Sequence, residues 1–126
     1  MILDAGVLIA IDRGTQTSKT LLTNVERLAE PLHTTAAVAA QAWRDGSRQV
    51  RLARALRAMT LHPFESGDVA RVGEALRRSG TADVVDAHLY VVAQRIGHDI
   101  LTSDADDFAS LGTAAAPNAP RVLAWQ

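Results

Sequence analysis

The stretch that decides the fold is Ile2-Leu3-Asp4-Ala5-Gly6-Val7-Leu8-Ile9-Ala10. Its first two apolar residues are typical of a short buried strand, and Val7–Ile11 has the pattern of a helix. Asp4 stands where the strand ends. Asp4 has no evident role as a helix cap. We therefore interpret this carboxylate as functional.

The same alternation of strand-like and helical segments continues along the chain. Further strands are predicted at Leu32–Thr34, Leu61–His62, Asp99–Thr102 and Val122–Trp125. Helices are predicted at Thr17–Glu30, Ala36–Arg44, Asp83–Ile96 and Asp104–Leu111, with two more that Ser47 and Ser66 cap and that run through Met59 and Arg78. This order predicts an α/β domain with a mainly parallel sheet and a loop over residues 112–120.

Finer features of these helices follow from the same patterns. Thr17 or Ser18 is the predicted N-cap of the second helix, and Val69, Val72 and Leu76 are predicted to face inward. The helix Asp83–Ile96 is apolar on most sides and is predicted to be the most buried.

Length and composition exclude several classes of protein. The 126 residues suit a single domain, residues 1–126, with its own core. The absence of cysteine excludes disulfides, cysteine–zinc sites and thiol nucleophiles, and it fits a reducing cytoplasm. The first residues lack the basic region of a secretory signal, and no window approaches the ~18 apolar residues of a membrane span. The net charge of −1 does not mark a nucleic-acid binder.

Acidic residues recur at the ends of predicted strands and at the start of a helix that precedes a strand. Asp4 ends the first strand, Asp104 ends the fourth, and Asp83 and Asp86 begin the helix that leads into the fourth strand. Ligands of open α/β sheets bind beyond the carboxyl ends of the strands. Carboxylates gathered there repel one another unless a cation lies among them, and Mg²⁺ and Mn²⁺ favour oxygen ligands. The sequence therefore predicts a divalent metal site.

Several of these residues also have a structural interpretation. Asp83 can cap its helix, Asp106 suits a plain surface position, and Asp107 suits either a helix turn or a ligand. The four histidines are scattered without ligand spacing, and His88 is taken as structural. Trp43 suits packing in the core or at a partner interface. The arginines that follow it suit a solvated helix face or, alternatively, a surface that tracks a phosphate backbone.

Three motifs give the chain a resemblance to the PIN-domain ribonucleases, especially the VapC-type toxins of toxin–antitoxin pairs. They are the opening stretch quoted above, Val85-Asp86-Ala87-His88-Leu89, and Ile100-Leu101-Thr102-Ser103-Asp104-Ala105-Asp106-Asp107-Phe108. The resemblance implies a sheet of about five parallel strands flanked by helices. It also implies that Asp4, Asp86 and Asp104 are catalytic and hold Mg²⁺ or Mn²⁺, with Asp83 and Asp107 as further metal ligands. A metal-activated water would then hydrolyse RNA and leave a 5′-phosphate and a 3′-hydroxyl.

The chain departs from the family pattern at two places. Ala5 and Gly6 follow the first Asp, where the family has a hydroxyl that supports metal-bound waters. Gln41 occupies the position of the usual second acid, and its neutral carbonyl is a weaker Mg²⁺ ligand. Asp45 is a possible substitute, although its Asp-Gly turn explains it without function. The alternative to an active enzyme is therefore a catalytically impaired PIN-like module for binding or dimerisation.

The resemblance also implies partners, namely an RNA substrate, a VapB-type antitoxin protein and a second copy of the chain in a homodimer. A third class, the receiver or phosphatase type of α/β protein, needs a lysine near a nucleophilic aspartate. The only lysine is Lys19, in a segment that is not expected to reach the acidic site.

Overall fold

The computed structural model describes residues 1–112 and 119–125. Within these ranges, five strands form one parallel sheet in the order β3-β2-β1-β4-β5. The strands are β1 (Ile2–Leu3), β2 (His33–Thr35), β3 (Thr60–His62), β4 (Ile100–Thr102) and β5 (Val122–Ala124). The predicted α/β fold with about five parallel strands is confirmed. The predicted loop over 112–120 lies mostly outside the described residues.

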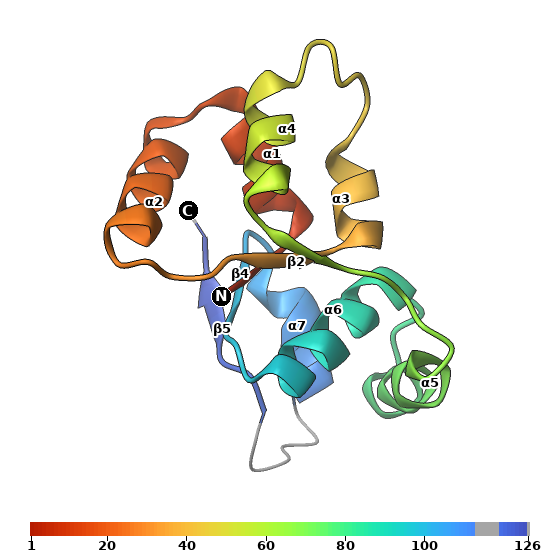
Figure 1. Cartoon of the computed structure of the whole chain (residues 1–126). Helices are drawn as coiled ribbons and strands as arrows, with labels where there is room; N and C mark the ends of the chain where they lie inside the picture. The colour runs from red at the N-terminus through yellow and green to blue at the C-terminus, as the bar shows by residue number, and fades with distance from the viewer. Residues whose placement is uncertain (113–118, 126) are drawn as a thin grey trace.

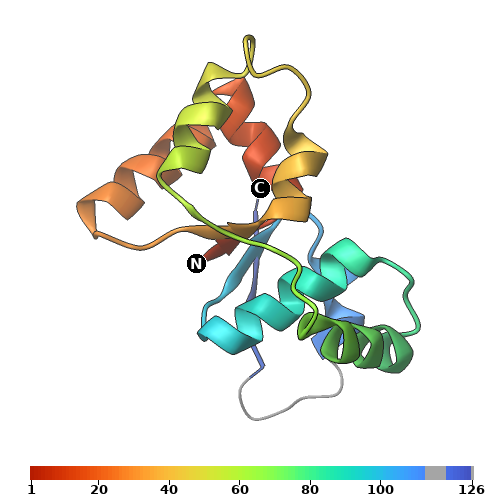
Figure 2. The same ribbon diagram turned by 45° about the vertical axis from the view of Figure 1, so that its right-hand side comes forward.

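Helices cover both faces of this sheet, as Figures 1 and 2 show. One face carries α1 (Ala5–Arg13), α2 (Gln16–Arg27), α3 (Ala36–Ala42) and α4 (Val50–Arg57). The other carries α5 (Asp68–Ser79), α6 (Val84–Ile96) and α7 (Ala105–Gly112). No helix in the described part of the chain has the length and apolar character needed to cross a membrane.

The core lies on both sides of the two central strands. Ile2, Leu3 and Ile100 are fully buried, because β1 and β4 are covered by helices on both faces. The middle of α6, residues 87–93, is buried throughout, as its apolar sequence predicts. This rigid centre fixes the strand ends at which the predicted acidic residues lie.

The start of α2 differs from the prediction. Thr15, and not Thr17 or Ser18, is the N-cap, and its hydroxyl oxygen accepts a hydrogen bond from the Ser18 N–H at 3.2 Å. Gly14 ends α1 in the left-handed conformation, with φ at 64°. Because this turn changes the direction of the chain within one residue, α2 can begin at Gln16, two residues after Gly14.

Ser47 does not cap α4 as predicted. Its N–H and its hydroxyl both donate to Asp45 Oδ1, at 3.1 and 2.7 Å, so Ser47 belongs to a turn before the helix. Gln49 organises that turn, because its Oε1 accepts from the Arg44 and Asp45 N–H groups and its amide donates to the Ala42 carbonyl. The helix therefore begins only at Val50.

The start of α5 is also displaced, with Gly67 rather than Ser66 as N-cap. Val69, predicted to face inward, is 61% exposed, whereas Asp68 is buried. Asp68 accepts hydrogen bonds from the Glu65 N–H and from Arg95 Nη1, the latter at 2.5 Å. Its Oδ2 also lies 3.2 Å from His88 Nε2. These polar contacts turn Asp68 toward α6, and Val69 consequently points to solvent.

Candidate functional site

Asp4 is buried at the junction between β1 and α1. Its Oδ1 accepts a hydrogen bond from the Ala5 N–H at 2.7 Å, and its backbone is extended, so it is the N-cap of α1. The prediction that Asp4 has no capping role is wrong, because α1 begins at Ala5 and not at Val7. Its second oxygen accepts from the Thr102 hydroxyl at 2.7 Å. Both carboxylate oxygens are therefore held in a fixed orientation.

Thr102 connects the ends of the two central strands. The pairing of Leu3 with Leu101 brings the end of β1 beside Thr102. The Thr102 hydroxyl donates to Asp4 and accepts from the Asp104 N–H at 3.0 Å. Sequence reasoning missed this residue. The available signal was a threonine two residues before an aspartate, a spacing at which a hydroxyl commonly binds the backbone.

Asp83 and Asp86 lie at the start of α6. Asp83 is the N-cap, and its Oδ1 accepts a hydrogen bond from the Asp86 N–H at 3.0 Å, so the capping interpretation of Asp83 is confirmed. Asp86 lies partly buried in the first turn. A negative charge near a helix N-terminus is favourable, although this contribution is small beside that of like charges nearby.

The electrostatics show that the predicted acids lie together. Burial, followed by the Asp83, Asp4 and Asp107 carboxylates, raises the pKa of Asp86 to about 7. The pKa of Asp107 is also raised, first by a hydrogen bond with Asp104, then by its limited desolvation and by the same neighbouring charges. Every side chain that shifts these two pKa values is itself a carboxylate. The fold thus brings other carboxylates close enough to Asp86 and Asp107 to disfavour the ionised forms of these two residues.

Other residues of the sequence hypothesis lie apart from this cluster. Gln41 is exposed on α3 and makes no hydrogen bond within the described ranges. Its role as a metal ligand stays a prediction. Asp45 binds Ser47 and lies 3.6 Å from Arg48 Nε, which agrees with its interpretation as a turn residue. Asp106 is exposed and is not among the groups that shift Asp86 or Asp107.

Gly6 leaves room for a hydroxyl from another segment. A Cβ at position 6 would collide with the side chain of Ser103, which follows β4. Position 6 carries no side chain, and the Ser103 hydroxyl lies against this part of α1. A side chain at position 6 and the present Ser103 side chain exclude each other.

The donor chemistry of the acidic cluster fits Mg²⁺ or Mn²⁺. In the described part of the chain, no three His, Cys, Asp or Glu side chains are arranged to hold a metal ion directly. Mg²⁺ is commonly bound through one or two carboxylates and keeps several waters, so a complete protein cage is not required. A cation among these carboxylates would offset the repulsion that raises the Asp86 pKa.

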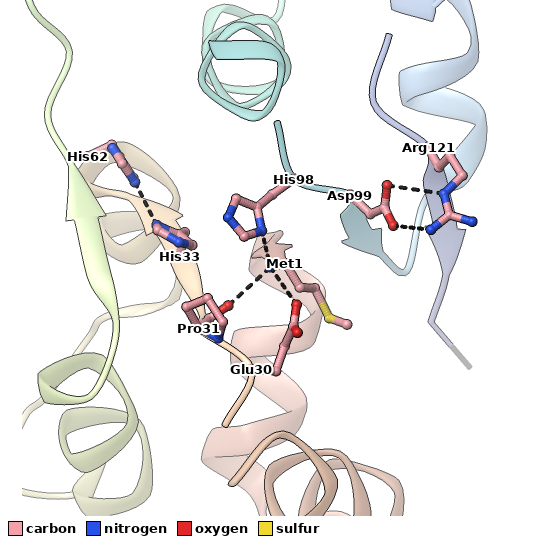
Figure 3. Close-up of polar contacts among 8 residues, drawn as sticks. All are labelled: Met1, Glu30, Pro31, His33, His62, His98, Asp99 and Arg121. Carbon is pink, nitrogen blue, oxygen red and sulfur yellow. Dashed lines mark hydrogen bonds and ion pairs between the residues drawn. The ribbon is translucent and has the colours of Figure 1, made fainter. Parts of the chain in front are cut away.

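Three histidines form a second cluster (Figure 3), in which His33 begins β2, His62 ends β3 and His98 precedes β4. His33 Nδ1 lies 3.0 Å from His62 Nε2, and the His33 and His98 ring centroids are 4.7 Å apart. The Met1 amino group lies 2.8 Å from His98 Nδ1. The prediction that the histidines are scattered is therefore wrong for these three, because parallel strand pairing joins residues far apart in sequence.

A parallel α/β sheet with acids at the carboxyl ends of its central strands defines a PIN-like fold. The PIN domain family matches residues 1–113, and the chain belongs to this family. Members are typically nucleases, and they generally use divalent metals. The fold matches a chain in the crystal structure of VapBC2 from Rickettsia felis bound to a DNA fragment from their promoter. The TM-score is 0.70 at 14% identity, covering 99% of this chain and 98% of that one. The comparison with curated proteins gives no match.

Proposed function

We propose that the chain, residues 1–126 as one PIN-like domain, is a Mg²⁺- or Mn²⁺-dependent endoribonuclease of the cytoplasm. The observation that carries this proposal is the acidic cluster, in which burial and neighbouring carboxylates raise the pKa of Asp86 to about 7. Strongly shifted groups of this kind gather at functional sites. Membership of a family whose members are typically nucleases supports the same reaction.

In this proposal, Asp4, Asp86 and Asp104 hold the ion, and Asp83 and Asp107 assist. When bound, a divalent cation supplies a more acidic water and offsets charge on the phosphoryl group. Hydrogen bonds within the chain orient the acidic side chains. The Thr102 hydroxyl donates to Asp4, and the Asp83 side chain accepts from the Asp86 N–H in the first turn of α6. The reaction is hydrolysis of an RNA phosphodiester bond.

A cleavage assay with Mn²⁺ and labelled RNA tests this proposal. Wild-type protein is expected to cut RNA, and Asp86→Asn and Asp107→Asn are expected to lose most of the activity. Asp106→Asn is the matched control, because Asp106 neighbours Asp107 on the same helix but lies outside the acidic cluster. Cleavage by Asp86→Asn at the wild-type rate would contradict the site.

Gln41 favours the alternative, a PIN-like module that binds or dimerises without cutting. If the wild type binds Mn²⁺ but cuts no RNA, that alternative is correct. Gln41→Glu distinguishes the two possibilities further, because restoring the usual acid should tighten Mn²⁺ binding and raise activity. An affinity that does not rise would mean that position 41 does not face the ion.

We also propose that the activity is that of a toxin controlled by a VapB-type antitoxin, in a homodimer. The structural neighbour is described as VapBC2, a name that covers two components. The described part of the chain has a groove of about 620 Å³ between α2 and α4. Leu22, Val25 and Met59 contribute apolar lining, and the charged lining has both signs, from Lys19, Arg51, Arg54, Glu26 and Glu30. Such a groove suits an amphipathic segment with charges of both signs on its polar side.

Co-expression with the product of the neighbouring upstream reading frame tests the antitoxin. It should co-purify with wild type, and Val25→Glu should weaken it by placing a charge in the groove. Val50→Glu is the control, because Val50 is 58% exposed on α4 and does not line the groove. Failure to co-purify or relieve toxicity contradicts the antitoxin. Sedimentation tests the dimer: the mass of a single 13.5 kDa chain would exclude it.

A further inference from the structure

A second cavity, distinct from the α2–α4 groove, lies between the three helices on the other face of the sheet. Its volume is about 550 Å³, within the range of small-ligand sites. Helix α5 contributes Arg71 and Arg78, and α6 contributes Tyr90, Gln94 and Arg95. Leu111 of α7 lies at its wall. The cavity therefore combines apolar walls with arginines from two helices.

The cavity adjoins the acidic cluster along α6 and α7. Asp86, Tyr90 and Gln94 are four residues apart in turn, so they lie along one side of α6. Asp107 and Leu111 have the same spacing on α7. Each step of four residues advances about 6 Å along a helix. A chain molecule bound at the acidic cluster could continue along these two helices into the cavity.

Three polar side chains of the cavity have no partner within the described residues. Tyr90 is only 5% exposed as a residue and makes no hydrogen bond there. Gln94 and Arg71 make none either. Arg78 and Arg95, in contrast, are paired with Glu74 and Asp68, at 2.9 and 2.5 Å. Arg71, Tyr90 and Gln94 are thus the groups available to a ligand.

We propose that this cavity binds the sugar–phosphate backbone of single-stranded RNA next to the cut site. The inference rests on the proposed nuclease function and names where its substrate lies. An acidic cluster alone repels RNA, so positive charge must act elsewhere on the strand. Arg71 provides that charge for a phosphate, while the Tyr90 hydroxyl and the Gln94 amide provide hydrogen bonds to phosphate or ribose oxygens.

Fluorescence anisotropy with a labelled single-stranded RNA, without added divalent ions, measures binding apart from cleavage. Arg71→Gln should weaken binding about three- to tenfold and reduce the slope of log affinity against log salt by about 0.7. Tyr90→Phe should weaken binding to a smaller extent without changing that slope, because it removes a hydroxyl but no charge. Arg27→Gln is the control, since Arg27 is an exposed arginine on the opposite face of the sheet.

With Mn²⁺ present, Arg71→Gln should raise KM and leave kcat nearly unchanged, because the contact is made equally before and during the reaction. Wild-type affinity and salt slope for both Arg71→Gln and Tyr90→Phe would overturn the RNA assignment. Displacement of RNA by poly-glutamate as effectively as by unlabelled RNA would also overturn it, in favour of an acidic protein segment. RNA binding that depends on Arg71 in a wild type that never cuts RNA would instead contradict only the nuclease function.

Discussion

The molecule carries two clusters of titratable groups with opposite chemistry, one of aspartates and one of histidines. Beyond the ends of β1 and β4, burial and neighbouring carboxylates raise the pKa of Asp86 to about 7. In the histidine cluster, burial and the neighbouring His98 and His62 lower the pKa of His33. Burial and Arg95 lower the pKa of His62 in the same way. In both clusters the fold disfavours the charged form.

The difference lies in what each cluster needs near neutral pH. The environment of His33 and His62 favours their neutral forms, and the histidine rings contact one another without any added ion. In the acidic cluster, burial and neighbouring carboxylates disfavour the ionised form of Asp86. A divalent cation among these carboxylates would offset their mutual repulsion. We therefore propose a functional role for the acidic cluster and a structural role for the histidine cluster.

The largest effect on activity is expected from removing the Thr102 hydroxyl, which holds Asp4 in the acidic cluster. Thr102→Val keeps the shape of the side chain but removes the hydrogen bonds to Asp4 and Asp104. Loss of such a supporting contact should reduce Mn²⁺-dependent cleavage about 10- to 100-fold. Thr60→Val on the edge strand β3 is the control, because Thr60 is an exposed threonine away from the cluster. Equal activity in both variants would show that Thr102 does not position Asp4.

A stability change of about 1–3 kcal/mol is expected from Gly6→Ser, because the new Cβ collides with Ser103. Urea unfolding measures this loss. The double variant Gly6→Ser with Ser103→Gly should recover most of it, since it moves the hydroxyl from one segment to the other. If the double variant is as unstable as the single one, the two side chains do not compete for the same space.

A stability change that depends on pH is expected for Asp86 without divalent ions. Its folded-state pKa lies above the unfolded value of 3.8, so the folded protein binds more protons between those two values. The free energy of unfolding therefore falls as pH rises from about 4 to about 7. Asp86→Asn should flatten this fall and stabilise the metal-free protein at neutral pH. Asp106→Asn should retain the wild-type slope, and the same flattening in that variant would contradict the assignment.

The smallest effect on stability is expected in the histidine cluster, where the dependence of stability on pH has the opposite sign to that of Asp86. The folded-state pKa of His33 lies below its unfolded value of 6.5, so the folded protein binds fewer protons near that pH. The free energy of unfolding therefore decreases as pH falls through 6.5. His33→Gln should flatten this decrease, measured by urea unfolding across that range. An unchanged slope would mean that folding does not lower the pKa of His33.

Local patterns predicted the elements and the acidic positions well. Strand-like pairs of apolar residues followed by Asp4 and by Asp104 needed only neighbouring residues to be recognised, and parallel strands necessarily bring such ends to one edge. The long apolar helix α6, with Asp83 before it, was also predictable from its local sequence. These features follow from periodicity and chain order, which a sequence contains directly.

Contacts between distant residues were not predictable in this way. The buried Asp68 was missed because its partner Arg95 lies 27 residues away, and that pairing decides which side of α5 faces inward. Thr102 and Asp4 are 98 residues apart, so their hydrogen bond follows from strand pairing and not from either segment. The Gly6–Ser103 contact has the same origin. A local pattern contains no information about such pairs.

The measurement that tests the central claim most directly is calorimetry of Mn²⁺ binding in buffers of different ionisation enthalpy. If the ion binds among these carboxylates, it must displace the proton that Asp86 retains below its raised pKa. Wild type should therefore bind Mn²⁺ with release of about one proton when the pH is well below 7. Asp86→Asn should bind far more weakly and release fewer protons. Undiminished Mn²⁺ binding by Asp86→Asn, with the same proton release, would contradict the account.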